Sequence, residues 1–153
     1  MRRTITAVVC SLFALGVHSG TRTCSCFHMG PEGDYRGQLG NTDAVFRGTV
    51  LRVQELTGIP GRDLQRSPLR LVVFQVSGAW KGMNEQVAYV FTQRDGTACG
   101  YPFEEGKEYV VWAVRDDVDV PGELATGTCR STREVQNASE QLKQLGKPKL
   151  VLK

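Results

Sequence analysis

Apolar residues recur with the periods of β-strands through the middle of the chain. Residues 69–76 are apolar at both parities, which predicts a central strand covered on both faces. Residues 87–92 alternate, with Val87, Tyr89 and Phe91 on one face, and residues 109–114 form another apolar run. A short fifth strand is expected around 123–129. These runs predict a small, mainly β protein.

The first predicted strand, residues 44–55, changes its apolar parity part of the way along. Phe46 and Val50 share one face, whereas Leu51 and Val53 are out of phase with them. Gly48 lies between the two patterns, and a glycine inside a strand is typical of a bulge. We therefore expect one bent strand that serves two faces of a curled sheet.

Glycine and proline mark the connections. Residues 27–43 have little periodicity and predict a surface loop, residues 57–67 predict a hairpin loop, and residues 77–82 predict a turn. Residues 93–107 are expected to form a further loop that holds Cys99.

The period changes near the end of the chain. Ser131 and Glu134 have the spacing of a capping box, which predicts a helix start there. One apolar helix face follows, and Gly146 ends it; this face comprises Val135, Ala138, Leu142 and Leu145. Five short strands followed by a packed helix predict a five-stranded Greek-key barrel of the OB type.

The first nineteen residues have the pattern of a secretory signal peptide. Arg2 and Arg3 precede a short apolar run, and small residues favour a cut before Gly20, with Cys24 as the alternative start. Cys10 would leave with this segment. Residues 20–153 are then expected to form one domain outside the cytoplasm: secreted, or in the periplasm or cell envelope of a bacterium.

Charge indicates no acidic partner. The chain has 19 basic and 16 acidic residues; loss of Arg2 and Arg3 leaves 17 against 16, a net charge of +1. A near-neutral chain without a basic run lacks the electrostatic signature of nucleic-acid binding. No second long apolar run follows, so we expect no membrane span.

Four cysteines remain in the mature chain: Cys24, Cys26, Cys99 and Cys129. Export and an even count predict two disulfides. A bond between Cys24 and Cys26 would close a strained ring, because only Ser25 separates them. The other two pairings both tie the N-terminal segment to the middle and end of the domain. The sequence does not choose between them, but either predicts a rigid ridge suited to another protein's cleft.

Several short motifs follow one another in a distinctive order: Cys24-Ser25-Cys26, Gly40-Asn41-Thr42-Asp43, Trp80-Lys81-Gly82, Ala98-Cys99-Gly100-Tyr101 and Thr128-Cys129. This order resembles the inhibitory domain of the tissue inhibitors of metalloproteinases, and the resemblance runs from about Cys24 to just beyond Cys129. Netrin-like modules, many of which are not inhibitors, share this barrel.

The resemblance implies an OB barrel with disulfides Cys24–Cys99 and Cys26–Cys129. It also implies that the amine and carbonyl oxygen of an N-terminal Cys24 hold the zinc of a target endopeptidase. Ser25 would point into the specificity pocket, and Thr97 and Ala98 would line the cleft. The predicted inhibitory ridge comprises Cys24, Ser25, Cys26, Phe27, Thr97, Ala98 and Cys99.

Two features depart from the family pattern. Gly40 stands where the family has a cysteine of a third disulfide, so we expect a looser 27–43 loop. A signal cut before Gly20 would leave four residues attached ahead of Cys24. The Cys24 nitrogen would then be an amide rather than the amine that binds zinc. The alternative function is therefore a netrin-like extracellular binding module that does not inhibit. A structural protein of the cell envelope is a third reading.

Few residues support catalysis or a resident metal. His28 is the only histidine of the predicted mature chain. A metal site built from several histidines is therefore excluded, and no Ser-His-Asp triad is indicated. Acidic residues at 104–105 and 116–119 lack the spacing of a calcium loop. We expect no enzyme activity, no cofactor, no metal of the protein's own, and a monomer. Trp112 is expected in the core, whereas Trp80, in a turn, is ambiguous.

The intact mass of the exported protein, measured with and without reduction, tests the predicted processing and disulfides. We expect the mass to rise by four hydrogens on reduction, because two disulfides open. The unreduced mass also identifies the first residue, Gly20 or Cys24. A mass that does not change on reduction would contradict the predicted disulfides.

Overall fold

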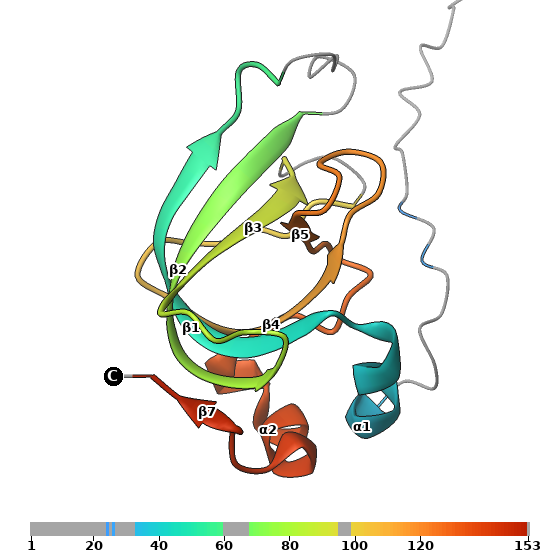
Figure 1. Cartoon of the computed structure of the whole chain (residues 1–153), viewed down its shortest axis with the longest axis vertical. Coiled ribbons are helices and arrows are strands. Elements are labelled where there is room, and N and C mark those ends of the chain that lie inside the picture. The colour runs from blue at the N-terminus through green and yellow to red at the C-terminus, as the bar shows by residue number, and fades with distance from the viewer. Residues whose placement is uncertain (1–23, 25, 27–32, 60–67, 95–98, 153) are drawn as a thin grey trace, which may run out of the picture.

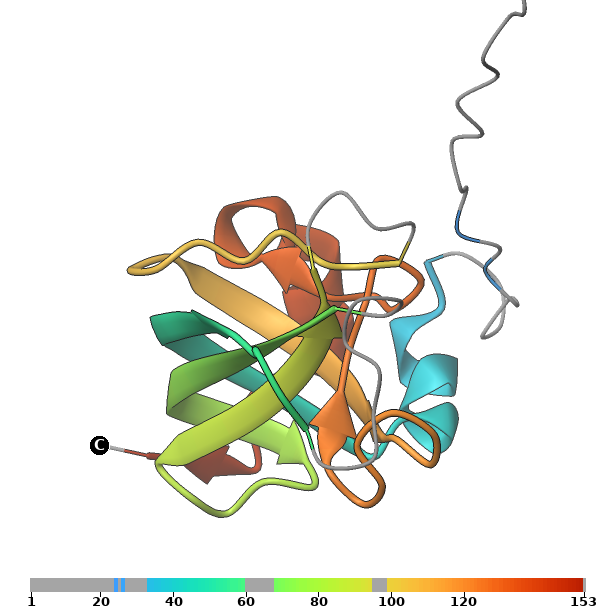
Figure 2. The same ribbon diagram turned by 90° about the horizontal axis from the view of Figure 1, so that it is seen from above.

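The computed structural model describes residues 24, 26, 33–59, 68–94 and 99–152. Five strands form a closed barrel (Figures 1 and 2): β1 (Ala44–Glu55), β2 (Leu69–Lys81), β3 (Val87–Gln93), β4 (Glu108–Arg115) and β5 (Leu124–Ala125). Their order is β1-β2-β3-β5-β4, and a β1–β4 pairing closes the ring. This is the predicted mainly β, OB-type barrel.

Strand β1 closes the barrel because it pairs antiparallel with two neighbours. Residues 44–49 of β1 pair with β4, whereas almost the whole length of β1 pairs with β2. The β1–β2 register shifts at three places, one of them between Arg47 and Gly48 and another between Val50 and Arg52. The predicted bend at Gly48 is therefore confirmed. Leu51 is left out of the pairing at the second shift and is exposed.

The barrel interior is filled by alternate residues of the strands. Phe74 is fully buried and makes edge-to-face contacts with Phe46 and Phe103, with ring centroids 5.5 and 5.2 Å apart. Tyr109 also meets Phe103, at 4.9 Å. These aromatic rings and the aliphatic side chains around them form the main core, which includes Ala44, Val50, Val72, Val76, Ala88, Val90 and Val111.

A second apolar cluster lies outside the barrel wall. The helices α1 (Tyr35–Gln38) and α2 (Ser139–Leu145) lie beside each other against β1 and β4 (Figure 1). A short 3-10 helix, Leu39–Asn41, follows α1 in the chain, and another, Val135–Asn137, precedes α2. The residues buried there are Val45, Trp80, Val110, Trp112 and Ala138.

Strand β4, rather than β2, is the strand covered on both faces. Its residues 109–113 are all buried, because one face lines the barrel and the other meets the helices. The outward side chains of β2, such as Leu71 and Val73, are only half-buried. The prediction that residues 69–76 are covered on both faces was therefore wrong. Apolar residues on both faces of a strand do not show whether another element packs against its outer face.

Three further predictions need correction: the end of β2, the buried face of β3, and the loop before β1. β2 continues to Lys81, and the turn falls at Gly82, whose φ is +67°. In β3 the buried face is Ala88, Val90 and Thr92, while Tyr89 is 55% exposed. Residues 33–43, expected as a loop, contain α1, whose Asp34 side chain accepts a hydrogen bond from the Gly37 amide at 2.9 Å.

The predicted capping box does not start the C-terminal helix. Arg133–Glu134 form a short strand, β6, paired with β4, and α2 begins at Ser139 without a side-chain cap. Ser131 instead donates a short hydrogen bond to Gln38. The predicted apolar face is correct, because Val135, Ala138, Leu142 and Leu145 pack on the second cluster. The helix ends at Gly146 as expected, and Leu150–Val151 form β7 on the edge of β2.

No helix in the described part of the chain is long and apolar enough to span a membrane.

A matched pair of valines tests the core. Val111 is 0% exposed inside the barrel, and Val118 is 82% exposed. Val111→Ala should lower the free energy of unfolding by about 2–3 kcal/mol, because each buried carbon contributes about 0.8 kcal/mol and a cavity remains. Val118→Ala should change it by less than about 0.5 kcal/mol. Urea unfolding of both variants measures the difference, and equal losses would contradict the assigned core.

Candidate functional site

The parallel pairing of β3 with β5 brings distant cysteines together. Phe91 is paired with Ala125, and the Thr126 amide donates to the Phe91 carbonyl oxygen at 2.9 Å. Because parallel strands run in the same direction, the segments that follow them leave the same edge of the barrel. Cys99 follows β3 and Cys129 follows β5. The Thr128 amide donates to the Cys99 carbonyl oxygen at 3.1 Å, which fixes the two segments side by side.

Both N-terminal cysteines are bonded to this junction. Cys24 is joined to Cys99 and Cys26 to Cys129, each with a Cα–Cα distance of 5.1 Å. The two predicted disulfides are therefore present, in the pairing that the resemblance implied and that the spacing alone left open. The loops they close, 75 and 103 residues long, would each contribute about 4–5 kcal/mol to stability in the chain-entropy model.

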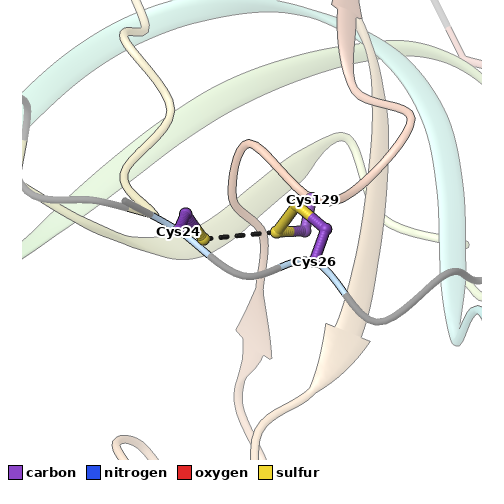
Figure 3. Close-up of side chains that lie close together, drawn as sticks. All are labelled: Cys24, Cys26 and Cys129. Carbon is purple, nitrogen blue, oxygen red and sulfur yellow. Dashed lines mark hydrogen bonds between the residues drawn. A yellow bond between two sulfur atoms is a disulfide. The ribbon is translucent and has the colours of Figure 1, made fainter. Parts of the chain in front are cut away.

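The two disulfides touch each other. The Sγ of Cys24 lies 3.2 Å from the Sγ of Cys129 (Figure 3). Neither sulfur carries a proton in the oxidised chain, so this is a van der Waals contact rather than a hydrogen bond. Cys26 is exposed, whereas Cys24 and Cys129 are half-buried.

These sulfurs also form the one group of metal-type ligands found in the part of the chain that the structure describes. The sulfurs of Cys24, Cys26 and Cys129 lie within 4.8 Å of one another. All of them are held in disulfides, and a thiolate rather than a disulfide is the metal ligand. In the oxidised protein the cluster is therefore a covalent staple, not a metal centre.

Two glycines allow the close approach of the backbones around Cys99. A Cβ at Gly127 would lie 2.4 Å from the Cys99 carbonyl oxygen. A Cβ at Gly100 would lie 2.4 Å from the Gln93 carbonyl oxygen and 2.5 Å from that of Arg94. Both positions exclude any side chain. Of these, only Gly100 carried a sequence signal, as part of the motif after Cys99.

A surface cavity of about 380 Å³ lies beside Cys99. Phe91 and Leu69 form part of its apolar wall, and the loop between β4 and β5 contributes Val118 and Val120. Arg130 also lines it and is half-buried; burial lowers the pKa of Arg130, while the charge of Asp43 opposes that shift. The sequence reasoning missed both the cavity and Arg130, since neither belongs to a periodic pattern.

The acidic residues serve local structure. The carboxylate of Asp116 accepts hydrogen bonds from the amides of residues 118, 119 and 120, at 3.1, 2.7 and 2.8 Å. Glu104 pairs with Lys107 at 2.8 Å, and Glu105 accepts from the Val53 amide at 2.8 Å. These bonds order a turn and a strand end.

Both tryptophans belong to the second apolar cluster. The indole of Trp112 donates to the Gln141 side-chain oxygen at 3.2 Å, and that of Trp80 donates to the Gly146 carbonyl oxygen at 2.9 Å. Trp112 is in a core, as predicted, and Trp80 is 6% exposed at the end of β2. Neither is a surface platform for a ligand.

Of the predicted ridge, the structure describes Cys24, Cys26 and Cys99 and brings them together. Ser25, Phe27, Thr97 and Ala98 lie outside the described residues, as does His28. A comparison with protein-family models found no match, and a search among curated proteins found none either.

A pair of glycine substitutions tests the backbone contacts around Cys99. Gly100→Ala should lower the free energy of unfolding by about 1–3 kcal/mol, because the new methyl meets two backbone oxygens that cannot rotate away. At Gly40 a Cβ meets no atom within 4 Å. Gly40→Ala should therefore leave stability unchanged or raise it by up to about 1 kcal/mol. Denaturant unfolding without reductant compares them; a harmless Gly100→Ala would contradict the close approach.

Proposed function

We propose that this chain is an exported inhibitor of a zinc metalloendopeptidase, similar to the inhibitory domain of the tissue inhibitors of metalloproteinases. One observation carries the proposal. The segment holding Cys24 and Cys26 is bonded at both cysteines to neighbouring points of a barrel edge, through Cys99 and Cys129. A chain start fixed in this way is the feature that the inhibitor family uses to enter a protease cleft.

The chemistry of a chain start suits a catalytic zinc. Such a zinc keeps one coordination position open for water or substrate. A free α-amine has a pKa near 8, so its neutral form is readily available as a nitrogen ligand. With Cys24 as first residue, its amine and carbonyl oxygen would approach the zinc of the target. The disulfide involves only the side chain of Cys24, so it does not occupy either of these backbone groups.

The staples also reduce the entropy that binding would lose. A flexible segment loses conformational freedom when a partner orders it, by about 1–2 kcal/mol per residue for the backbone alone. Two disulfides restrict the segment before the enzyme arrives. By the resemblance, Ser25 would then enter the specificity pocket, with Phe27, Thr97 and Ala98 alongside.

The location and state of the protein belong to the same proposal. Two disulfides are compatible with an extracellular or periplasmic location, where thiols are oxidised. We propose that the inhibitor is a monomer without a cofactor or metal of its own, and that the only zinc involved is that of the target.

A second function follows from the sequence ahead of Cys24. Small residues favour a cut before Gly20, which leaves residues 20–23 attached. An amide nitrogen at Cys24 is a much poorer metal ligand than an amine. With those residues retained, the same stapled barrel is proposed to be a netrin-like extracellular binding module without zinc chelation.

Two chains that differ only at the start test the inhibitor proposal. A chain beginning at Cys24 should inhibit the catalytic domain of a matrix-type zinc endopeptidase in a peptide-hydrolysis assay. A chain beginning at Gly20 should bind at least roughly 100-fold more weakly, because loss of the amine ligand removes about 3 kcal/mol or more. Both chains share the barrel and staples, so the comparison isolates the amine.

The control is the unfolding transition and the disulfide map, which should be the same for the two chains. Equal inhibition by both would show that the amine is not the contact. Absence of inhibition by the Cys24 chain, across several zinc endopeptidases, would favour the binding module.

A further inference from the structure

We propose that the Cys26–Cys129 disulfide is a modification site for external thiols, and that the displaced Cys129 thiolate passes the exchange to Cys24. The inference rests on the contact between the two disulfides and on the exposure of Cys26. It does not depend on protease inhibition, since the chemistry needs only the oxidised chain and a low-molecular-weight thiol such as glutathione.

Exposure selects the first sulfur to be attacked. Thiol–disulfide exchange needs access to a disulfide sulfur. Cys26 is exposed, whereas Cys24 and Cys129 are half-buried. The external thiolate attacks the Sγ of Cys26, forming a mixed disulfide there. The Cys26–Cys129 bond breaks, and its electron pair leaves with Cys129 as a thiolate.

The position of Cys129 directs the second step. Its Sγ lies 3.2 Å from the Sγ of Cys24, which is one end of the other disulfide (Figure 3). Attack on Cys24 forms a Cys24–Cys129 bond and breaks Cys24–Cys99. Cys99 leaves as a thiolate and takes up the proton that the external thiol lost. Each step makes one S–S bond and breaks one, so no oxidant or reductant is consumed.

The backbone keeps Cys129 in place after Cys26 has been released. Thr128 donates its amide to the Cys99 carbonyl oxygen at 3.1 Å, and Arg130 donates its amide to the Gly127 carbonyl oxygen at 3.0 Å. These hydrogen bonds hold the residues on both sides of Cys129 without help from either disulfide. The new thiolate therefore stays beside Cys24 rather than swinging into solvent.

The product has a different pattern of attachment. The N-terminal segment keeps one bond to the barrel, Cys24–Cys129, and Cys26 carries the external thiol. Cys99 becomes a free thiol and is no longer bonded to the segment. One covalent adduct at the surface thus changes both attachments of the predicted ridge.

Trypsin makes the two possible products distinguishable. Cleavage at arginine and lysine places Cys24 and Cys26 in peptide 23–36, Cys99 in peptide 95–107 and Cys129 in peptide 116–130. The full oxidised chain is treated with glutathione at about pH 8, where its thiolate is populated. The reaction is stopped early by acid, free thiols are alkylated, and the peptides are separated by mass without reduction.

The proposal expects a mass shift of one glutathione on peptide 23–36, a link from that peptide to 116–130, and the alkylated thiol on 95–107. Direct attack on Cys24 would give the same three masses, so fragmentation of the linked peptide between Cys24 and Cys26 must locate the glutathione, which the proposal places on Cys26. Each of four results would overturn it. Glutathione on Cys24, with the Cys26–Cys129 link intact, would mean that the inner disulfide is attacked directly. Alkylation mainly on 116–130 would mean that the exchange stops at Cys129. Glutathione found first on 95–107, or no adduct at all, would mean that Cys26 is not the point of entry.

A double variant is the matched control. Cys24→Ser with Cys99→Ser removes the inner disulfide and leaves Cys26–Cys129 as the point of attack. Glutathione should still add to peptide 23–36, but the alkylated thiol should now be on 116–130. If the variant folds poorly, the wild-type peptide map still decides the proposal, because it is read from the native chain.

Discussion

Closure of the barrel through β1 is the constraint on which the rest of the structure depends. One bent strand pairs with β2 along one edge and with β4 along the other, and register shifts allow it to turn between them. Because the ring is closed, β5 must fit between β3 and β4. It does so with only two residues, parallel to β3 and antiparallel to β4. That short parallel pairing determines which chain segments meet at the barrel edge.

The β3–β5 pairing places the residues of the candidate site together. The segments after β3 and β5 leave the same edge, where backbone hydrogen bonds and the missing side chain of Gly127 bring them into contact. Cys99 and Cys129 are thus neighbours before any disulfide is considered. The spacing of Cys24 and Cys26 then matches the spacing of two anchors that the fold has already placed.

The sequence predicted the strands better than their surroundings. Apolar patterning located the four long barrel strands and the apolar face of the C-terminal helix, because each depends on neighbouring residues in the chain. The two-residue strand β5 lies within the predicted range 123–129 but is much shorter. Patterning failed where the outcome depends on distant layers: the double coverage of β4 comes from helices far away in the sequence, and Ser131 bonds to Gln38 instead of capping. For the site, the disulfide pairing came from resemblance, since spacing left two pairings open, and Arg130 and Gly127 gave no local signal.

Stability and the proposed function depend on different atoms of the same residue. The Sγ of Cys24 is part of the staple, and its disulfide forms whether or not residues precede it. Zinc binding would depend on the backbone nitrogen of Cys24, which takes no part in the disulfide. A stable barrel can therefore occur with either function, and a correct fold does not select between them. Under the proposal, processing at the N-terminus would change the ligand without changing the core, so it would convert a binding module into an inhibitor at almost no cost in folding free energy.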